Sequence, residues 1–289
     1  MICNMSDKIR KDYRVYREKK MQKPYYQDPQ STIYHADSIE ALSELRESFD
    51  LVVADPPYTT GIASFGEDSK ASGWGDIMNS AHFNAAWLRE CRRLLENKQG
   101  AAWVFNSWRS LPILARTSYE IQWAICSVLI WDKMWIGPGG PNGLRPSYEL
   151  AALFVHKGFS ISNRGLPDIW RHQWSSVKPH GHPAEKPISL VAKMIRECGA
   201  KRVLDPFMGS GTTLEAAKQE GATAVGIEIE ERWCEVAAQR LSQGVLNFEN
   251  QEPASMPEEV SQKNNIECVQ NQRTTPALCN ADHIKELEL

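Results

Sequence analysis

Short apolar runs of strand length alternate with amphipathic helical segments along most of the chain. Seven apolar runs predict strands: 31–37, 49–58, 100–107, 122–132, 148–157, 202–207 and 223–229. Helices are predicted at 38–48, 82–97, 188–197, 212–220 and 231–243. This alternation is typical of an α/β fold in which helices cover both faces of a parallel sheet.

The pattern stops at both ends, which divides the chain into three parts. Residues 1–30 form a basic N-terminal arm, residues 31–248 form the folded domain, and residues 249–289 form an acidic, mostly disordered tail. The arm concentrates Lys and Arg between Lys8 and Lys23. Such a segment either neutralises nucleic-acid phosphates or forms an ordinary solvated helix, and both interpretations stay open.

Charge and cysteine usage narrow the function classes. The chain has 33 Lys and Arg against 36 Asp and Glu, so its net charge of -3 gives no overall preference for nucleic acid. Its seven cysteines are scattered without a CxxC pair, and His180 and His182 have no ligand pattern around them, so neither a metal site nor a disulfide framework is expected. Without a secretion signal or a bilayer-length apolar run, the expected location is the cytoplasm, away from membranes.

The first motif with chemical content is Asp55-Pro56-Pro57-Tyr58, directly after an apolar run. Two prolines stiffen a turn at the carboxyl end of a strand, where open α/β sheets bind ligands. The carboxylate of Asp55 and the carbonyl of Pro56 can accept the two protons of an amine, and the Tyr58 ring offers a flat face for a base. A plain structural turn is the alternative.

The second motif runs from Asp205 to Thr213 as DPFMGSGTT, between a strand and a helix. Its glycines allow backbone N–H groups to approach an anionic group at the start of the helix. No Lys follows the second glycine, so a phosphate-binding P-loop is disfavoured. Glu228 ends the next strand, about where ribose hydroxyls find an acidic partner, with Glu230 as a nearby competitor. A nucleoside with a small charged tail is implied.

Together, the two motifs resemble the β class of DNA amino-methyltransferases, in which DPPY precedes the glycine motif. The resemblance spans roughly residues 33–241 and includes HPAEKPISLVAKMI before the glycine motif. It implies a circularly permuted, Rossmann-like, seven-stranded methyltransferase fold, with an inserted target-recognition region at about 137–182. In this fold the strands that carry the two motifs lie side by side and share one cleft.

The resemblance also implies site residues. Asp55, Pro56, Pro57 and Tyr58 would hold the target base, and the loop that begins at residue 59 would become ordered when DNA binds. S-adenosylmethionine would be bound by Asp37, Lys186, Asp205, Pro206, Phe207, Gly209, Ser210, Gly211, Thr212 and Glu228, with Lys186 near its methionine part and Asp37 near its adenine. A helix N-cap is the other interpretation of Asp37.

The reaction implied is direct transfer of a methyl group to N6 of adenine in double-stranded DNA, after the base is flipped. N4 of cytosine is the alternative target, and a catalytically inactive DNA-binding relative is a further one. Relatives that modify RNA or protein glutamine usually carry Asn before the prolines, whereas here the residue is Asp55. Base contacts would come from among Arg145, Arg164, Arg171 and Lys178, unless these are surface charges. A homodimer is one assembly that the resemblance leaves open.

Overall fold

The structure is a computed structural model that describes residues 23–57, 81–95, 99–137, 143–175 and 180–243. All of them belong to the first of two units into which the chain divides, residues 1–246. Most of the predicted basic arm and the whole predicted tail lie outside the described residues, as does Tyr58.

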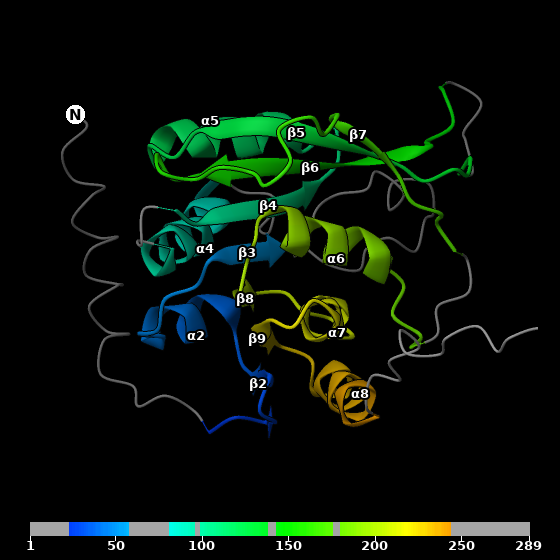
Figure 1. The fold of residues 1–289 in the computed structure, drawn as a ribbon. Coiled ribbons are helices and arrows are strands. Elements are labelled where there is room, and N and C mark those ends of the chain that lie inside the picture. Colours follow the sequence, from blue (N-terminus) through cyan, green and yellow to red (C-terminus); the bar gives the residue numbers. More distant parts are fainter. Residues whose placement is uncertain (1–22, 58–80, 96–98, 138–142, 176–179, 244–289) are drawn as a thin grey trace, which may run out of the picture. The chain divides into compact units, whose positions relative to one another are not determined.

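The described residues form one nine-stranded sheet with the order β1-β2-β9-β8-β3-β4-β6-β5-β7 (Figure 1). The strands are β1 (Tyr26–Gln27), β2 (Ser31–His35), β3 (Leu51–Ala54), β4 (Ala101–Asn106), β5 (Ile125–Asp132), β6 (Tyr148–Val155), β7 (Ile169–Arg171), β8 (Arg202–Asp205) and β9 (Thr223–Glu228). The seven predicted strands are all present. Two short strands that the sequence pattern did not predict, β1 and β7, extend the two edges.

Strand direction decides which residues share an edge of the sheet. β2, β9, β8, β3 and β4 pair in parallel, whereas β6 is antiparallel to both of its neighbours, β4 and β5. The amino end of β6 therefore lies at the same edge as the carboxyl ends of the parallel strands. That edge is where open α/β sheets bind ligands.

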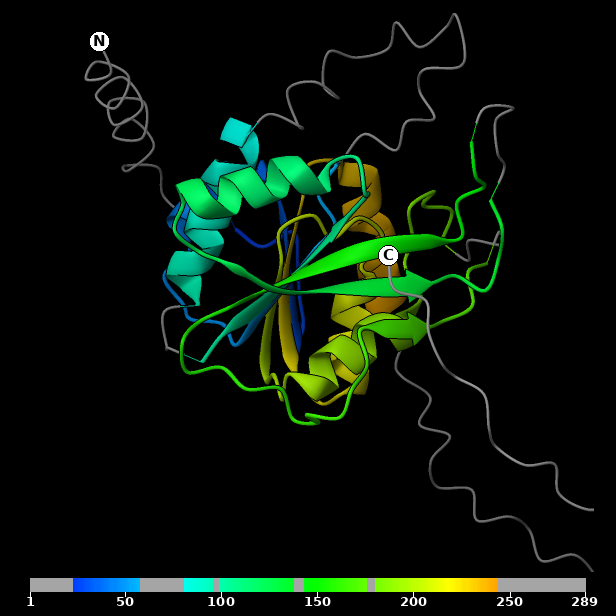
Figure 2. The same ribbon diagram turned by 90° about the horizontal axis from the view of Figure 1, so that it is seen from above.

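Helices cover both faces of the sheet (Figures 1 and 2). Their bounds are α2 (Ser38–Glu44), α4 (Ala81–Leu94), α5 (Leu111–Glu120), α6 (Ile188–Glu197), α7 (Thr212–Gln219) and α8 (Glu231–Ser242). Buried residues of α6, α7 and α8 pack in one apolar cluster, and those of α2, α4 and α5 in another. In β3, Val53 joins the first cluster and Val52 the second, as the two-residue period of a strand buried on both faces requires.

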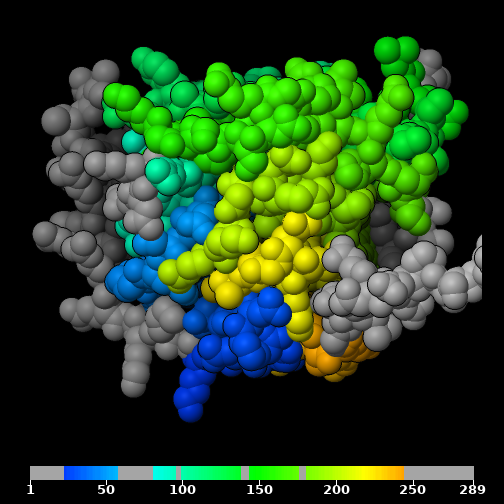
Figure 3. Space-filling view, in the orientation of Figure 1, coloured from blue at the N-terminus to red at the C-terminus, as the bar shows by residue number. Residues whose placement is uncertain are grey.

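The parallel strand pairs also bring distant parts of the chain together. β2, near the start of the described residues, pairs with β9 and contacts α8, near their end. Figure 3 shows these first and last elements side by side on one face. Among the described residues, no helix is both long and apolar enough to span a bilayer.

Three details differ from the sequence-based expectations. The helix α5 was not predicted, because its buried face includes Thr117 and Ser118 beside Leu114 and so lacks a clear apolar stripe. Residues 26–27 of the predicted arm form β1, so the sheet begins before residue 31. The predicted target-recognition region, about 137–182, contains β7 as a second strand beside the predicted β6.

Candidate active site

The two sequence motifs meet at one edge of the sheet. β3 and β8 are parallel neighbours, with Leu51 opposite Val203 and Val52 opposite Leu204. Asp55 follows the last residue of β3, and Asp205 is the last residue of β8. Both motifs open into one cavity of about 1800 Å³. A typical pocket for one small molecule has roughly 300–1,000 Å³, so this cavity has room for two bound groups.

Most of the predicted site residues line this cavity. They are Asp37, Asp55, Pro56, Pro57, Lys186, Asp205, Pro206, Phe207, Gly209, Ser210, Thr212 and Glu228. Gly211 is not a lining residue, and Tyr58 lies outside the described residues. The lining also includes aromatic side chains from the region after β5, among them Trp135 and Trp174, whose rings stack with centroids 4.2 Å apart.

Asp55 has one engaged and one open carboxylate oxygen. Its Oδ2 accepts a hydrogen bond from the ammonium group of Lys186, which lies in the segment before α6. Its Oδ1 is buried and has no hydrogen-bond partner among the described residues. Burial raises the pKa of Asp55 above its ordinary value, and the positive charge of Lys186 offsets this only in part. The Oδ1 atom therefore keeps its capacity to accept a hydrogen bond.

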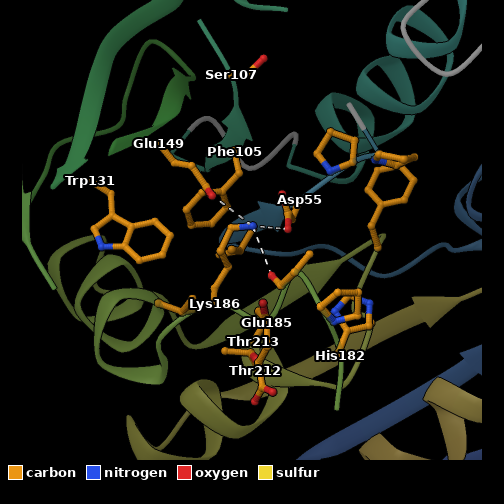
Figure 4. A pocket seen from close by; sticks show the side chains of 18 of the residues that line it. Asp55, Phe105, Ser107, Trp131, Glu149, His182, Glu185, Lys186, Thr212 and Thr213 are labelled. Atoms are coloured by element: carbon orange, nitrogen blue, oxygen red, sulfur yellow. Dashed lines mark hydrogen bonds and ion pairs between the residues drawn. The ribbon is translucent and has the colours of Figure 1, made fainter. Parts of the chain in front are cut away.

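Lys186 is shared between two carboxylates (Figure 4). Its Nζ lies 3.4 Å from Oε2 of Glu149, whose Oε1 is 2.5 Å from Nζ of Lys133. Burial alone would raise the pKa of Glu149, but the two lysines hold it below its ordinary value. The Nζ of Lys186 also lies 5.0 Å from the centre of the Phe105 ring, within reach of a cation–π contact.

The glycine motif forms a tight turn that leads into α7. Gly209 and Gly211 have φ angles of 52° and 83°, in the left-handed region that favours glycine. A Cβ atom on Gly211 would lie 2.8 Å from Cβ of Ala237 in α8, so this residue lets the turn approach the helix. The backbone N–H of Gly209 donates to Oε2 of Glu228 over 3.0 Å, and burial raises the pKa of Glu228.

Asp205 is bound by its own loop. It is 4% exposed and accepts hydrogen bonds from the backbone N–H of Phe207, over 2.9 Å, and from the Thr213 side chain. Burial raises the pKa of Asp205 to about 7, although these hydrogen bonds oppose the shift. Its carboxylate therefore fixes the turn.

A buried arginine ties the glycine turn to the segment that carries Lys186. Nη1 of Arg240 in α8 donates to the carbonyl of Ser210 and to Oε1 of Glu185, over 3.1 Å in each case, and its Nε pairs with Glu215. The Arg240 side chain is 2% exposed. Because Glu185 immediately precedes Lys186, this arginine connects the two halves of the cavity.

Asp37 caps the helix α2. Its Oδ1 accepts hydrogen bonds from the backbone N–H groups of Ile39 and Glu40, over 2.9 and 3.1 Å, as an N-cap residue does. The helix-cap interpretation therefore holds. Asp37 is also exposed to the cavity, and its Oδ2 takes no part in the cap, so a cofactor contact remains a separate prediction.

Other candidates from the sequence have structural partners. Nδ1 of His180 lies 2.8 Å from Oε1 of Glu185, an acidic neighbour that the sequence analysis did not credit to it, and His182 packs edge-on against Trp233. Nε of Arg145 donates to the carbonyl of Gly137, over 2.8 Å. Arg171 pairs with Asp132. Arg164 is exposed, and Lys178 lies outside the described residues.

The sequence did not indicate Glu149 and Lys133, the carboxylate and the cation that extend the ion pair of Asp55 and Lys186. Neither belongs to a recognised motif. The available signal was the amino end of the strand at 148–157, but its use required knowing that this strand is antiparallel. The sequence also gave no indication of Arg240, the buried arginine that connects the two halves of the cavity, because it lies within an ordinary amphipathic helix pattern.

Comparison with known proteins identifies the family. Residues 49–239 match the family model N6_N4_Mtase, described as DNA methylase. The chain belongs to this family of DNA methylases. The Type II methyltransferase M.HinfI of Haemophilus influenzae is 29% identical over 255 residues, which are 76% of this chain and 71% of that protein. The DNA adenine methyltransferase YhdJ of Escherichia coli strain K12 is 27% identical over 248 residues, 73% of this chain and 82% of that protein.

A solved structure shares the fold. The crystal structure of the M1.HpyAVI complex with S-adenosylmethionine matches with a TM-score of 0.56 and 23% identity, covering 73% of this chain and 99% of that one. The family resemblance, the methyltransferase fold class and the enzyme class predicted from the sequence are confirmed.

Proposed function

We propose that the chain transfers a methyl group from S-adenosylmethionine to N6 of adenine in double-stranded DNA. The observation that carries this proposal is Oδ1 of Asp55, a buried acceptor with no hydrogen-bond partner among the described residues, on a side chain that lines the same cavity as the glycine turn. Membership of the DNA methylase family supports DNA as the substrate.

The glycine-motif half of the cavity suits S-adenosylmethionine. Carboxylates of Asp37 and Glu228 lie among apolar side chains such as Phe207 and Ile229, a combination that fits ribose hydroxyls beside a purine ring. The turn that begins α7 supplies backbone N–H groups for a carboxylate. When bound, the cofactor supplies an electrophilic methyl group on a positively charged sulfur. The acidic cavity walls favour that charge.

Asp55 and Pro56 act on the amine. An exocyclic amine is a poor nucleophile, because its lone pair is delocalised into the base. Hydrogen bonds from its two protons to Oδ1 of Asp55 and to the carbonyl of Pro56 draw the lone pair out of conjugation and stabilise the positive charge that develops on nitrogen. Pro56 is buried, which keeps water away from this position. The mechanism needs no covalent intermediate with the enzyme.

Methyl transfer by the purified protein tests the proposal. Tritiated S-adenosylmethionine and mixed-sequence duplex DNA would be incubated with the wild-type protein and with Asp55→Ala. We expect label in DNA with the wild-type protein only, because the variant lacks the acceptor carboxylate. Undiminished labelling by the variant would refute the assigned role. If the wild-type protein labels no duplex but binds DNA, the inactive DNA-binding alternative is favoured.

N4 of cytosine is the second candidate acceptor, since the family model covers N6 and N4 methylases. Adenine is favoured because an initial Asp in the proline motif is the family's usual choice for adenine, and because YhdJ is a DNA adenine methyltransferase. Digestion of the methylated DNA to nucleosides followed by mass spectrometry distinguishes the two. N6-methyl-2′-deoxyadenosine is expected, and N4-methyl-2′-deoxycytidine would reassign the acceptor.

A further inference from the structure

Four charged side chains of alternating sign lie one after another in space along one wall of the cavity. Lys133 follows β5, Glu149 is the second residue of β6, Lys186 precedes α6, and Asp55 follows β3. Their exposed fractions lie between 9% and 22%. We call these four residues the charge chain. Asp55 acts on the amine in the proposed reaction and the family resemblance assigns Lys186 to the cofactor, whereas Glu149 and Lys133 have no assigned role.

Glu149 lies between Lys133 and Lys186. Trp131 pairs with Glu149 across β5 and β6, which places Glu149 close to the end of β5 and to Lys133. One oxygen of Glu149 takes Lys133 and the other takes Lys186. The Lys186 side chain is only 9% exposed, and its ammonium group requires a counter-charge, because an uncompensated buried charge is strongly unfavourable. Glu149 thus supplies the second counter-charge that fixes Lys186.

The position of Lys186 decides which oxygen of Asp55 is available. Lys186 holds Oδ2, and Oδ1 has no hydrogen-bond partner among the described residues. Without this hold, the carboxylate can rotate about its terminal torsion, which has a broad, roughly two-fold energy profile. Oδ1, which must point at the amine of the target base, then loses its orientation.

We propose that Glu149 is a positioning residue for methyl transfer: it holds Lys186 against Oδ2 of Asp55, so that Oδ1 faces the target amine. The inference rests on the proposed function, in which Asp55 accepts an amine proton. It extends the reacting machinery to a strand that carries neither sequence motif.

Kinetics of Glu149→Gln separate positioning from general stabilisation. Glutamine keeps the size of the side chain and removes its charge. We expect kcat to fall by about tenfold or more, the effect of losing a hydrogen bond to a charged group. The KM values for S-adenosylmethionine and DNA should stay within about twofold, because the residue acts on orientation rather than on ground-state binding. Glu120→Gln is the matched control: it removes the ion pair with Arg116 on the surface of α5 and should leave kcat unchanged.

A double-mutant cycle with Lys186→Met gives the decisive readout. If Glu149 acts through Lys186, adding Glu149→Gln to Lys186→Met should change kcat by less than about twofold. Equal losses in both backgrounds would overturn the proposal, as would a wild-type kcat in Glu149→Gln. If Glu149→Gln does not fold, Lys133→Gln replaces it, and its kcat loss must also vanish in the Lys186→Met background. A wild-type protein that methylates no adenine would instead refute the proposed function.

Discussion

Asp55 and Asp205 follow the same sequence logic and differ in their surroundings. Each stands at the end of a parallel strand, each precedes a proline, and burial raises the pKa of both. Asp205 accepts hydrogen bonds from the backbone of Phe207 in the following turn and from the side chain of Thr213 at the start of α7. Asp55 is held by the side chain of Lys186, 131 residues away, and keeps one oxygen open.

The difference separates a carboxylate that builds a loop from one that acts on a substrate. One backbone donor and one side-chain donor, both close in sequence, bind Asp205, so its hydrogen bonds maintain the glycine turn. A distant cation satisfies only one oxygen of Asp55, and within the described part of the chain the other oxygen is buried without a hydrogen-bond partner. A buried polar atom without a partner is unfavourable for stability, and such atoms in native structures are often functional.

The largest expected effect is on kcat, when each of the two aspartates is replaced by asparagine in a separate variant. Asp55→Asn should lower kcat by ~100-fold or more, as removal of a transition-state partner does, with little change in the thermal midpoint. Asp205→Asn should lower kcat by about tenfold or less, because an amide oxygen can still accept from Phe207. Steady-state kinetics with tritiated cofactor measure both. Similar losses in the two variants would erase the distinction.

The anchoring of the glycine turn predicts the next effect. Arg240→Met should reduce the free energy of unfolding by about 3–5 kcal/mol, because it removes the buried arginine cation that pairs with the carboxylate of Glu185. Urea denaturation monitored by tryptophan fluorescence measures this change. Arg116→Met, which breaks an exposed pair on α5, is the control and should cost less than about 1 kcal/mol. Equal stability of the two variants would contradict the anchoring role.

The pH dependence of stability sharpens the comparison on the Asp205 side. Its pKa is raised from 3.8 to about 7, so between these values the native state binds the proton more tightly than the unfolded state. Stability from this group is therefore full below pH 4 and is lost as pH rises through 7. The free energy of unfolding of the wild type relative to Asp205→Asn should fall by on the order of 2–4 kcal/mol between pH 4 and 8. A pH-independent difference would place the Asp205 pKa near its ordinary value.

The meeting of the two motifs could be predicted from the family resemblance, in which the strands that carry them lie side by side, and each motif does follow an apolar run of the sequence. The charge chain could not be predicted from the sequence. Glu149 reaches that edge only because β6 is antiparallel, and an apolar run does not reveal its direction. The helix α5 escaped prediction for a related reason: its packing buries Thr117 and Ser118, which a hydrophobic pattern counts as exposed.

The smallest expected effect concerns Asp37, which offers both a helix cap and a possible cofactor contact. Asparagine caps helices about as well as aspartate, so Asp37→Asn should change the free energy of unfolding by less than about 0.5 kcal/mol. Asp37→Ala should lose about 1 kcal/mol, because the N–H groups of Ile39 and Glu40 lose their acceptor.

Cofactor affinity then separates the two roles of Asp37. If its Oδ2 accepts from the bound nucleoside, both variants should raise the Kd for S-adenosylmethionine by about tenfold, the effect of one hydrogen bond to a charged group. Isothermal titration calorimetry on the two variants and the wild type measures this. A wild-type Kd in Asp37→Asn would reduce Asp37 to a cap and leave Glu228 as the acidic residue on the cofactor side, whereas Asp55 would keep its place on the substrate side.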